Sequence, residues 1–144
     1  MKLQNFDFRI WDKHHKGCGN KDCKCQTKYV YGEEAKIRLS EFKEDCEIEL
    51  FTGLYDKNGN KIYEGDIVRC LTSQGKPLHY FVTTNENINT FQVFVISDLE
   101  KFKACSEIDI NNFLFCDLSN LEDMKFNSEV VGNIHYKREC KELV

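Results

Sequence analysis

The fold is decided by residues 48–68, which read IELFTGLYDKNGNKIYEGDIV. Asn58-Gly59 lies between two apolar runs and is a strong hairpin signal, because both central residues of a two-residue hairpin turn must tolerate positive φ. Gly65 lies between Glu64 and Asp66, where it predicts a second tight turn that leads into a strand over 67–70. The stretch therefore predicts consecutive antiparallel strands.

Strand-like patterns continue on both sides of this stretch. Apolar Phe6, Phe8 and Ile10 alternate with Asp7, Arg9 and Trp11, which predicts a strand with one buried face. Further strands are expected at 29–31, 79–83, 91–96 and 129–136. Residues 33–46 are expected to form a strand followed by a turn, and 98–105 a short helical turn.

Gly132 lies inside the last predicted strand and indicates a bulge or a close backbone approach. Many short strands separated by turns predict an all-β fold, either a barrel or a sandwich.

Composition fits one folded domain. The chain has 144 residues, 41% hydrophobic and 12% aromatic, which is enough apolar material for a core. We expect a single domain over 1–144, with a short-stranded N-terminal part at 1–60, a β-barrel part at 61–136 and an exposed tail at 137–144.

Charge and hydropathy limit the partners. The formal net charge is −4, which disfavours phosphate binding by charge alone, although a local basic patch could still contact nucleic acid. Apolar runs such as 91–96 are far shorter than the roughly 20 residues that span a bilayer. The first residues lack the apolar segment of a signal peptide, which favours the cytoplasm.

The chain has eight cysteines, and a reducing cytoplasm argues against a disulfide framework. The scattered ones are expected to be small core residues. They are Cys46, Cys70, Cys105, Cys116 and Cys140.

The segment 14–25 holds the one metal-like pattern in the sequence, HHKGCGNKDCKC. Cys18, Cys23 and Cys25 with His15 would supply the Cys₃His set of a structural zinc site, and His14 is the alternative to His15. Two other interpretations stay open. The segment could be a metal-free, thiol-rich surface loop, or one of its cysteines could be a nucleophile activated by a histidine.

Carboxylates and charges near the turns are expected to be structural. Asp56, Glu64 and Asp66 each adjoin a turn residue, where acidic side chains commonly bind the local backbone. Arg9 and Asp12 flank Trp11, and we expect a bridge or backbone bond that fixes the first strand. The alternative is that Trp11 anchors a subunit contact, because Trp and Arg are enriched at such sites.

Three segments together resemble the YopX family: 8–12 (FRIWD), 51–68 (FTGLYDKNGNKIYEGDIV) and 130–135 (VVGNIH). The order and spacing of these segments fit the family pattern along essentially the whole chain. The intervening stretches 13–47 and 71–127 match that pattern only in the general character of their residues. The Cys-rich loop at 14–25 is not part of the family pattern. The structural residues of the motif are Trp11, Gly53, Asn58, Gly59, Gly65, Asp66 and Gly132.

The resemblance implies an all-β protein of phages and prophages, with an SH3-like barrel at 61–136 and a tendency to self-associate. It implies no reaction. We therefore expect a non-enzymatic, oligomeric binding module that acts on a host or phage component in the bacterial cytoplasm. The alternatives are a nucleic-acid-associated regulator that uses the SH3-like part, which is a fold analogy, and a zinc- or thiol-dependent protein that uses residues 14–25.

Overall fold

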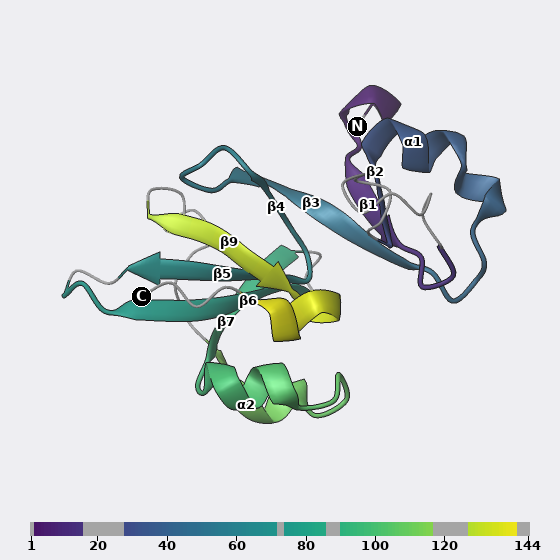
Figure 1. Cartoon of the computed structure of the whole chain (residues 1–144). Coiled ribbons are helices and arrows are strands. Elements are labelled where there is room, and N and C mark those ends of the chain that lie inside the picture. The colour runs from purple at the N-terminus through teal and green to yellow at the C-terminus, as the bar shows by residue number, and fades with distance from the viewer. Residues whose placement is uncertain (1, 16–27, 72–73, 86–89, 117–126, 141–144) are drawn as a thin grey trace. The chain divides into compact units, whose positions relative to one another are not determined.

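The computed structural model describes residues 2–15, 28–71, 74–85, 90–116 and 127–140. Its strands form antiparallel sheets with a few short helices, so the predicted all-β class is confirmed (Figure 1). The chain divides into two compact units, Met1–Phe51 and Thr52–Val144. The sequence instead placed an internal boundary at 60/61, within a single domain.

The first unit is a small sheet covered by a helix. The central strand β1 pairs antiparallel with β2 and with the first half of β3, so that Ile10 lies opposite both Val30 and Ile48. Phe8, Ile10, Val30 and Ala35 form its core. The elements are η1 (Leu3–Asn5), β1 (Phe8–Trp11), β2 (Tyr29–Tyr31), α1 (Gly32–Ile37), η3 (Leu39–Glu41) and β3 (Glu47–Tyr55).

The prediction of a strand within 33–46 is wrong, because this region forms α1 and η3. Glu33 and Glu34 lie in the first turn of α1, where negative charge favours a helix. Ala35 is completely buried against the sheet. Arg38 pairs with Glu34 and Glu41 along the helical surface. Burial of one short helical face therefore outweighed the alternation of Ile37 and Leu39.

The second unit holds a five-stranded antiparallel sheet in the order β8-β7-β6-β5-β9, of which Figure 1 labels β7, β6, β5 and β9. The hairpin expected from 79–83 and 91–96 is confirmed as β6 and β7. The expected short helix is α2, with the Asp98 carboxylate capping its first turn. The elements are β4 (Lys61–Tyr63), β5 (Asp66–Leu71), β6 (Pro77–Asn85), β7 (Thr90–Ile96), α2 (Leu99–Ala104), η4 (Ile110–Phe113), β8 (Leu114–Cys116), β9 (Ser128–Asn133) and η6 (Ile134–Glu139).

Both faces of this sheet are buried. One face packs against Phe102 of α2 and Ile134 of η6. The other packs against Ile62 of β4 and Leu54 of β3. Neighbouring residues such as Ile67 and Val68 therefore enter two different cores, which explains the continuous apolar runs of β5 to β7. The SH3-like description of 61–136 stays a prediction.

The hairpin between β3 and β4 is confirmed, but its turn differs from the predicted one. Gly59 donates its N–H to the Asp56 carbonyl, and Asp56 donates its N–H to the Asn60 carbonyl. Gly59 has a φ of +82°. This is a three-residue loop in which a glycine follows the turn, and it replaces the expected two-residue turn.

Gly65 lies directly before β5, and Gly132 lies near the end of β9. Gly65, with a φ of +88°, donates its N–H to the Val82 carbonyl and accepts from Ile134 N–H. The pairing of β5 with β9 shifts next to Gly132, so the predicted bulge is confirmed. A Cβ at Gly132 would lie 3.1 Å from the Cβ of Cys140, which confirms the close approach.

The exposed tail predicted from residue 137 is wrong for its first part. Lys137 and Cys140 are both buried, and η6 continues to Glu139. Residues 141–144 lie outside the described ranges.

Candidate functional site

Asp56 links the hairpin turn to β9, an edge strand of the second unit's sheet. Its Oδ1 accepts hydrogen bonds from Asn58 N at 2.9 Å and Asn60 N at 2.8 Å. Its Oδ2 accepts from Val130 N at 3.0 Å and from the Asn60 side chain at 3.3 Å. Burial raises the pKa of Asp56, but these hydrogen bonds together hold it below its ordinary value.

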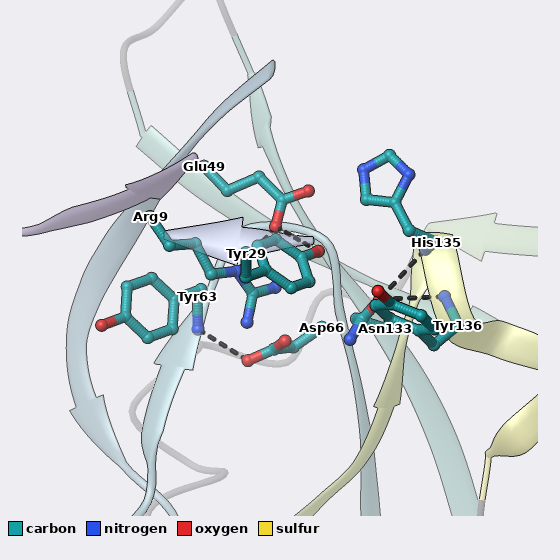
Figure 2. Close-up of polar contacts among 8 residues, drawn as sticks. All are labelled: Arg9, Tyr29, Glu49, Tyr63, Asp66, Asn133, His135 and Tyr136. Atoms are coloured by element: carbon teal, nitrogen blue, oxygen red, sulfur yellow. Dashed lines mark hydrogen bonds and ion pairs between the residues drawn. The ribbon is translucent and has the colours of Figure 1, made fainter. Parts of the chain in front are cut away.

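The other two turn carboxylates also accept hydrogen bonds from other residues of the second unit. Asp66 Oδ2 accepts from Tyr63 N at 2.8 Å (Figure 2), and Glu64 accepts from the Thr84 hydroxyl at 2.6 Å. Gly53, with a φ of +85°, lies in β3. The bonds that Asp56 and Asp66 accept from nearby backbone N–H groups confirm the predicted local role of these two carboxylates. Glu64 differs from the prediction, because it accepts from the Thr84 side chain rather than from the local backbone.

A buried ion pair joins β1 to β3 in the first unit. Arg9 Nε donates to Glu49 Oε1 at 2.7 Å, and the Tyr29 hydroxyl donates to the same oxygen at 2.8 Å (Figure 2). The Arg9 guanidinium also lies 4.3 Å from the centre of the Tyr29 ring. The predicted bridge at Arg9 therefore exists, but its partner is Glu49 rather than a neighbour in sequence.

Asp12 and Trp11 secure the end of β1. Asp12 donates its N–H to the Lys28 carbonyl, and its carboxylate accepts from His14 N. Trp11 is half-buried, with its ring 5.4 Å from that of Tyr29 and beneath the Lys28 amine. The Tyr29 ring and the Lys28 amine therefore cover part of the Trp11 side chain.

The predicted zinc ligands are described in part. The His14 ring lies 3.0 Å from Asp45, whose pKa is held below its ordinary value by hydrogen bonds from Lys13 and His14. His15 is half-buried. Cys18, Cys23 and Cys25 lie outside the described residues.

Within the ranges that the structure describes, no group of three or more His, Cys, Asp or Glu side chains is arranged for a metal. The zinc hypothesis for 14–25 stays a prediction, with His15 as the fourth ligand and His14 as the alternative.

The scattered cysteines that the structure describes, and His79, are buried or half-buried. Cys140 is buried, and Cys46 and Cys70 are half-buried. His79 is half-buried on β6, and burial lowers its pKa. The burial of Cys140, Cys46 and Cys70 agrees with the expectation that the scattered cysteines are small core residues.

A pocket of about 340 Å³ lies between the end of α2 and η6. His135 Nδ1 is 3.3 Å from Glu107 Oε1, and Asn133 accepts from the N–H groups of His135 and Tyr136 (Figure 2). Lys137 of one wall contacts Cys105 of the other. No sequence pattern predicted this pocket, because its two walls are some thirty residues apart in the chain. It is lined by Cys105, Ser106, Glu107, Ile134, His135, Tyr136, Lys137, Arg138 and Glu139.

These features define an antiparallel β protein in which carboxylates and glycines fix the turns between strands. The family model described as YopX protein matches residues 7–139. The chain therefore belongs to the YopX family, as the three sequence segments indicated. No curated protein matches it. Among the described helices, none is both long and apolar enough to cross a bilayer.

Proposed function

We propose that this YopX protein acts by binding rather than by catalysis, and that it does so as a homo-oligomer. The observation that supports this is a set of exposed apolar side chains around α1 in the first unit. Leu3, Ile37 and Leu39 are 73%, 81% and 53% exposed, and we call them the α1 patch.

The α1 patch joins two neighbouring elements. The Lys36 amine donates to the Leu3 carbonyl at 2.9 Å and pairs with Glu33 at 3.1 Å, which holds η1 beside α1 (Figure 1). Large apolar side chains that gather at the surface mark interaction sites more often than scattered ones do. A second copy of the chain is the partner that the YopX resemblance favours.

The turn carboxylates support a non-enzymatic role. Asp56 accepts four hydrogen bonds, and Asp66 and Glu64 accept from Tyr63 and Thr84. General acid–base catalysis needs a carboxyl group that is positioned on a substrate, and these groups are occupied by the fold. We propose that the oligomer presents loops to a host or phage component in the bacterial cytoplasm.

Light scattering across a dilution series tests self-association. We expect the unchanged protein to exceed the mass of one chain at high concentration. Ile37→Asp with Leu39→Asp should shift it to the monomer, because charges would have to be desolvated in the interface. Ile108→Asp is the matched control, since Ile108 is 89% exposed in the second unit. A monomer at the highest concentration, or equal effects of control and patch variants, contradicts the proposal.

Nucleic-acid binding is the competing function. An acidic chain that makes few phosphate contacts should show no binding to DNA or RNA even at low salt. Binding that weakens steeply as salt rises would favour the regulator interpretation instead.

A further inference from the structure

We propose that Arg69, His79 and Lys103 form a binding site for one small tetrahedral oxyanion, such as phosphate or sulfate. The three side chains come from β5, β6 and α2, and they lie at the polar end of the sheet face whose apolar part packs against α2. The site belongs to the second unit alone, so the proposal is independent of the α1 patch and of self-association.

The strand register places Arg69 and His79 side by side. They are direct partners in the antiparallel pairing of β5 with β6, and directly opposite residues project from the same face of a sheet. Ile67 and Phe81, two residues away on the same strands, are also partners, and both belong to the core that contains Phe102 of α2. Because side chains alternate between faces along a strand, Arg69 and His79 share the face that α2 covers.

Lys103 reaches the same place from α2. Its side chain is 15% exposed, and its Nζ donates to the Cys140 carbonyl at 3.4 Å. Burial lowers the pKa of His79, and the charges of Arg69 and Lys103 lower it further, which indicates that both cations lie close to the imidazole. Two cations and a neutral imidazole therefore converge on one half-buried position.

The carboxylates nearby balance this positive charge only in part. Arg69 Nη2 is 3.6 Å from Glu129 Oε2, and Lys57 Nζ is 3.8 Å from the same oxygen, so two cations share one carboxylate. Lys103 Nζ is 3.8 Å from Glu100, whose side chain is 67% exposed. Charged hydrogen bonds are ordinarily about 2.7–2.9 Å long, so all three contacts are loose. An arginine has five N–H donors, so Arg69 can bind a second acceptor beside Glu129.

A buried nitrogen of His79 is an independent sign of a ligand. Nε2 is buried, and no residue in the described part of the chain forms a hydrogen bond with it. Buried polar atoms are nearly always bonded, so an exception calls for a partner such as an ion. A neutral imidazole can carry its proton on Nε2, and rotation about χ2 brings the Nε2–H group toward an incoming anion.

These three groups select the chemistry of the ligand. A guanidinium and an ammonium supply charged N–H donors and the imidazole supplies a neutral one, which together suit the several oxygens of a tetrahedral oxyanion. The site is half-buried and has two cations, so it takes a single anion rather than the repeated phosphates of a nucleic acid. A carboxylate such as acetate offers two oxygens to these donors and should bind more weakly.

Nuclear magnetic resonance of the histidine rings tests the proposal. Inorganic phosphate is titrated into the full chain at constant pH and constant ionic strength, with sodium chloride as the salt that it replaces. We expect a saturable shift of the His79 ring signal that exceeds the shifts of the other histidines, which are His14, His15 and His135. An unmoved His79 signal, or a shift of all the rings that does not saturate, overturns the proposal. Acetate that binds as tightly as phosphate overturns the choice of a tetrahedral oxyanion.

Charge variants assign the binding to the two cations. Arg69→Gln and Lys103→Gln should each weaken phosphate binding about tenfold, because each removes a charged hydrogen bond. Lys101→Gln is the matched control, because Lys101 is an exposed residue of the same helix with the same charge as Lys103. Circular dichroism checks that the variants fold, and if Arg69→Gln does not, Lys103→Gln decides. Equal effects of Lys101→Gln and Lys103→Gln refute the site.

Discussion

Asp56→Asn should destabilise this protein, although asparagine is ordinarily a good turn residue. An asparagine can keep the oxygen that accepts from Asn58 and Asn60. Its NH₂ group would then face the Val130 N–H, which now donates to Asp56 Oδ2 at 3.0 Å. Two donors would oppose each other at the edge of β9.

The magnitude follows from these contacts. A hydrogen bond to a charged group contributes about 1.5–3 kcal/mol, so loss of the Val130 bond should cost about 2 kcal/mol. Asp56→Ala also loses the turn contacts. The amides of Asn58 and Asn60 lie in exposed residues that water can reach, so their loss adds less and brings the total to about 3 kcal/mol.

Urea unfolding at pH 7, followed by far-UV circular dichroism, measures the free energy of unfolding. With a slope of about 1–2 kcal/mol/M, Asp56→Asn should lower the midpoint by about 1–2 M. Asp98→Asn is the matched control. Asp98 caps α2 through its side chain, and asparagine caps a helix equally well, so this variant should leave the midpoint unchanged.

Lowering the pH gives an independent check. The pKa of Asp56 is lower in the folded chain than its ordinary value of about 3.9, so its stabilising effect is complete above that value. The effect is lost as the pH falls below it and the carboxylate is protonated. The stability difference between unchanged protein and Asp56→Asn should therefore shrink below about pH 4. A midpoint for Asp56→Asn equal to that of the unchanged protein at pH 7 would refute the reasoning.

Three further predictions concern other parts of the chain. Gly132→Ala should lower the free energy of unfolding by about 1–3 kcal/mol, because the new Cβ would lie 3.1 Å from the Cβ of Cys140. Adding Cys140→Gly to this variant should recover part of the loss, as measured by urea unfolding. Glu49→Ala should destabilise the first unit by about 3 kcal/mol, because Arg9 would lose its buried ion-pair partner. The fluorescence of Trp11, the chain's single tryptophan, can follow the unfolding of this unit, and an unchanged unfolding midpoint would contradict the prediction. Elemental analysis of untagged protein should find about one zinc per chain if residues 14–25 hold the ion, and a value near zero rejects that site.

Local features were predictable because backbone sterics act over a few residues. Asn58-Gly59 predicted the hairpin, and Gly132 predicted the bulge. The turn subtype was missed, since the carboxylate of Asp56 favours a longer loop by bonding two amides within the turn. The helix α1 was missed because its burial depends on a sheet that comes together from other parts of the chain.

The sequence by itself determined the β class, the positions of the main turns and the YopX family. Each of these depends on short sequence patterns whose structural preference does not depend on the rest of the chain. Only the tertiary structure decided which distant groups meet. Arg9 pairs with Glu49 across a strand register, and Lys137 reaches Cys105 because η6 folds back onto α2. Such contacts depend on long-range packing, in which a shift of one residue in register would place each side chain on the opposite face.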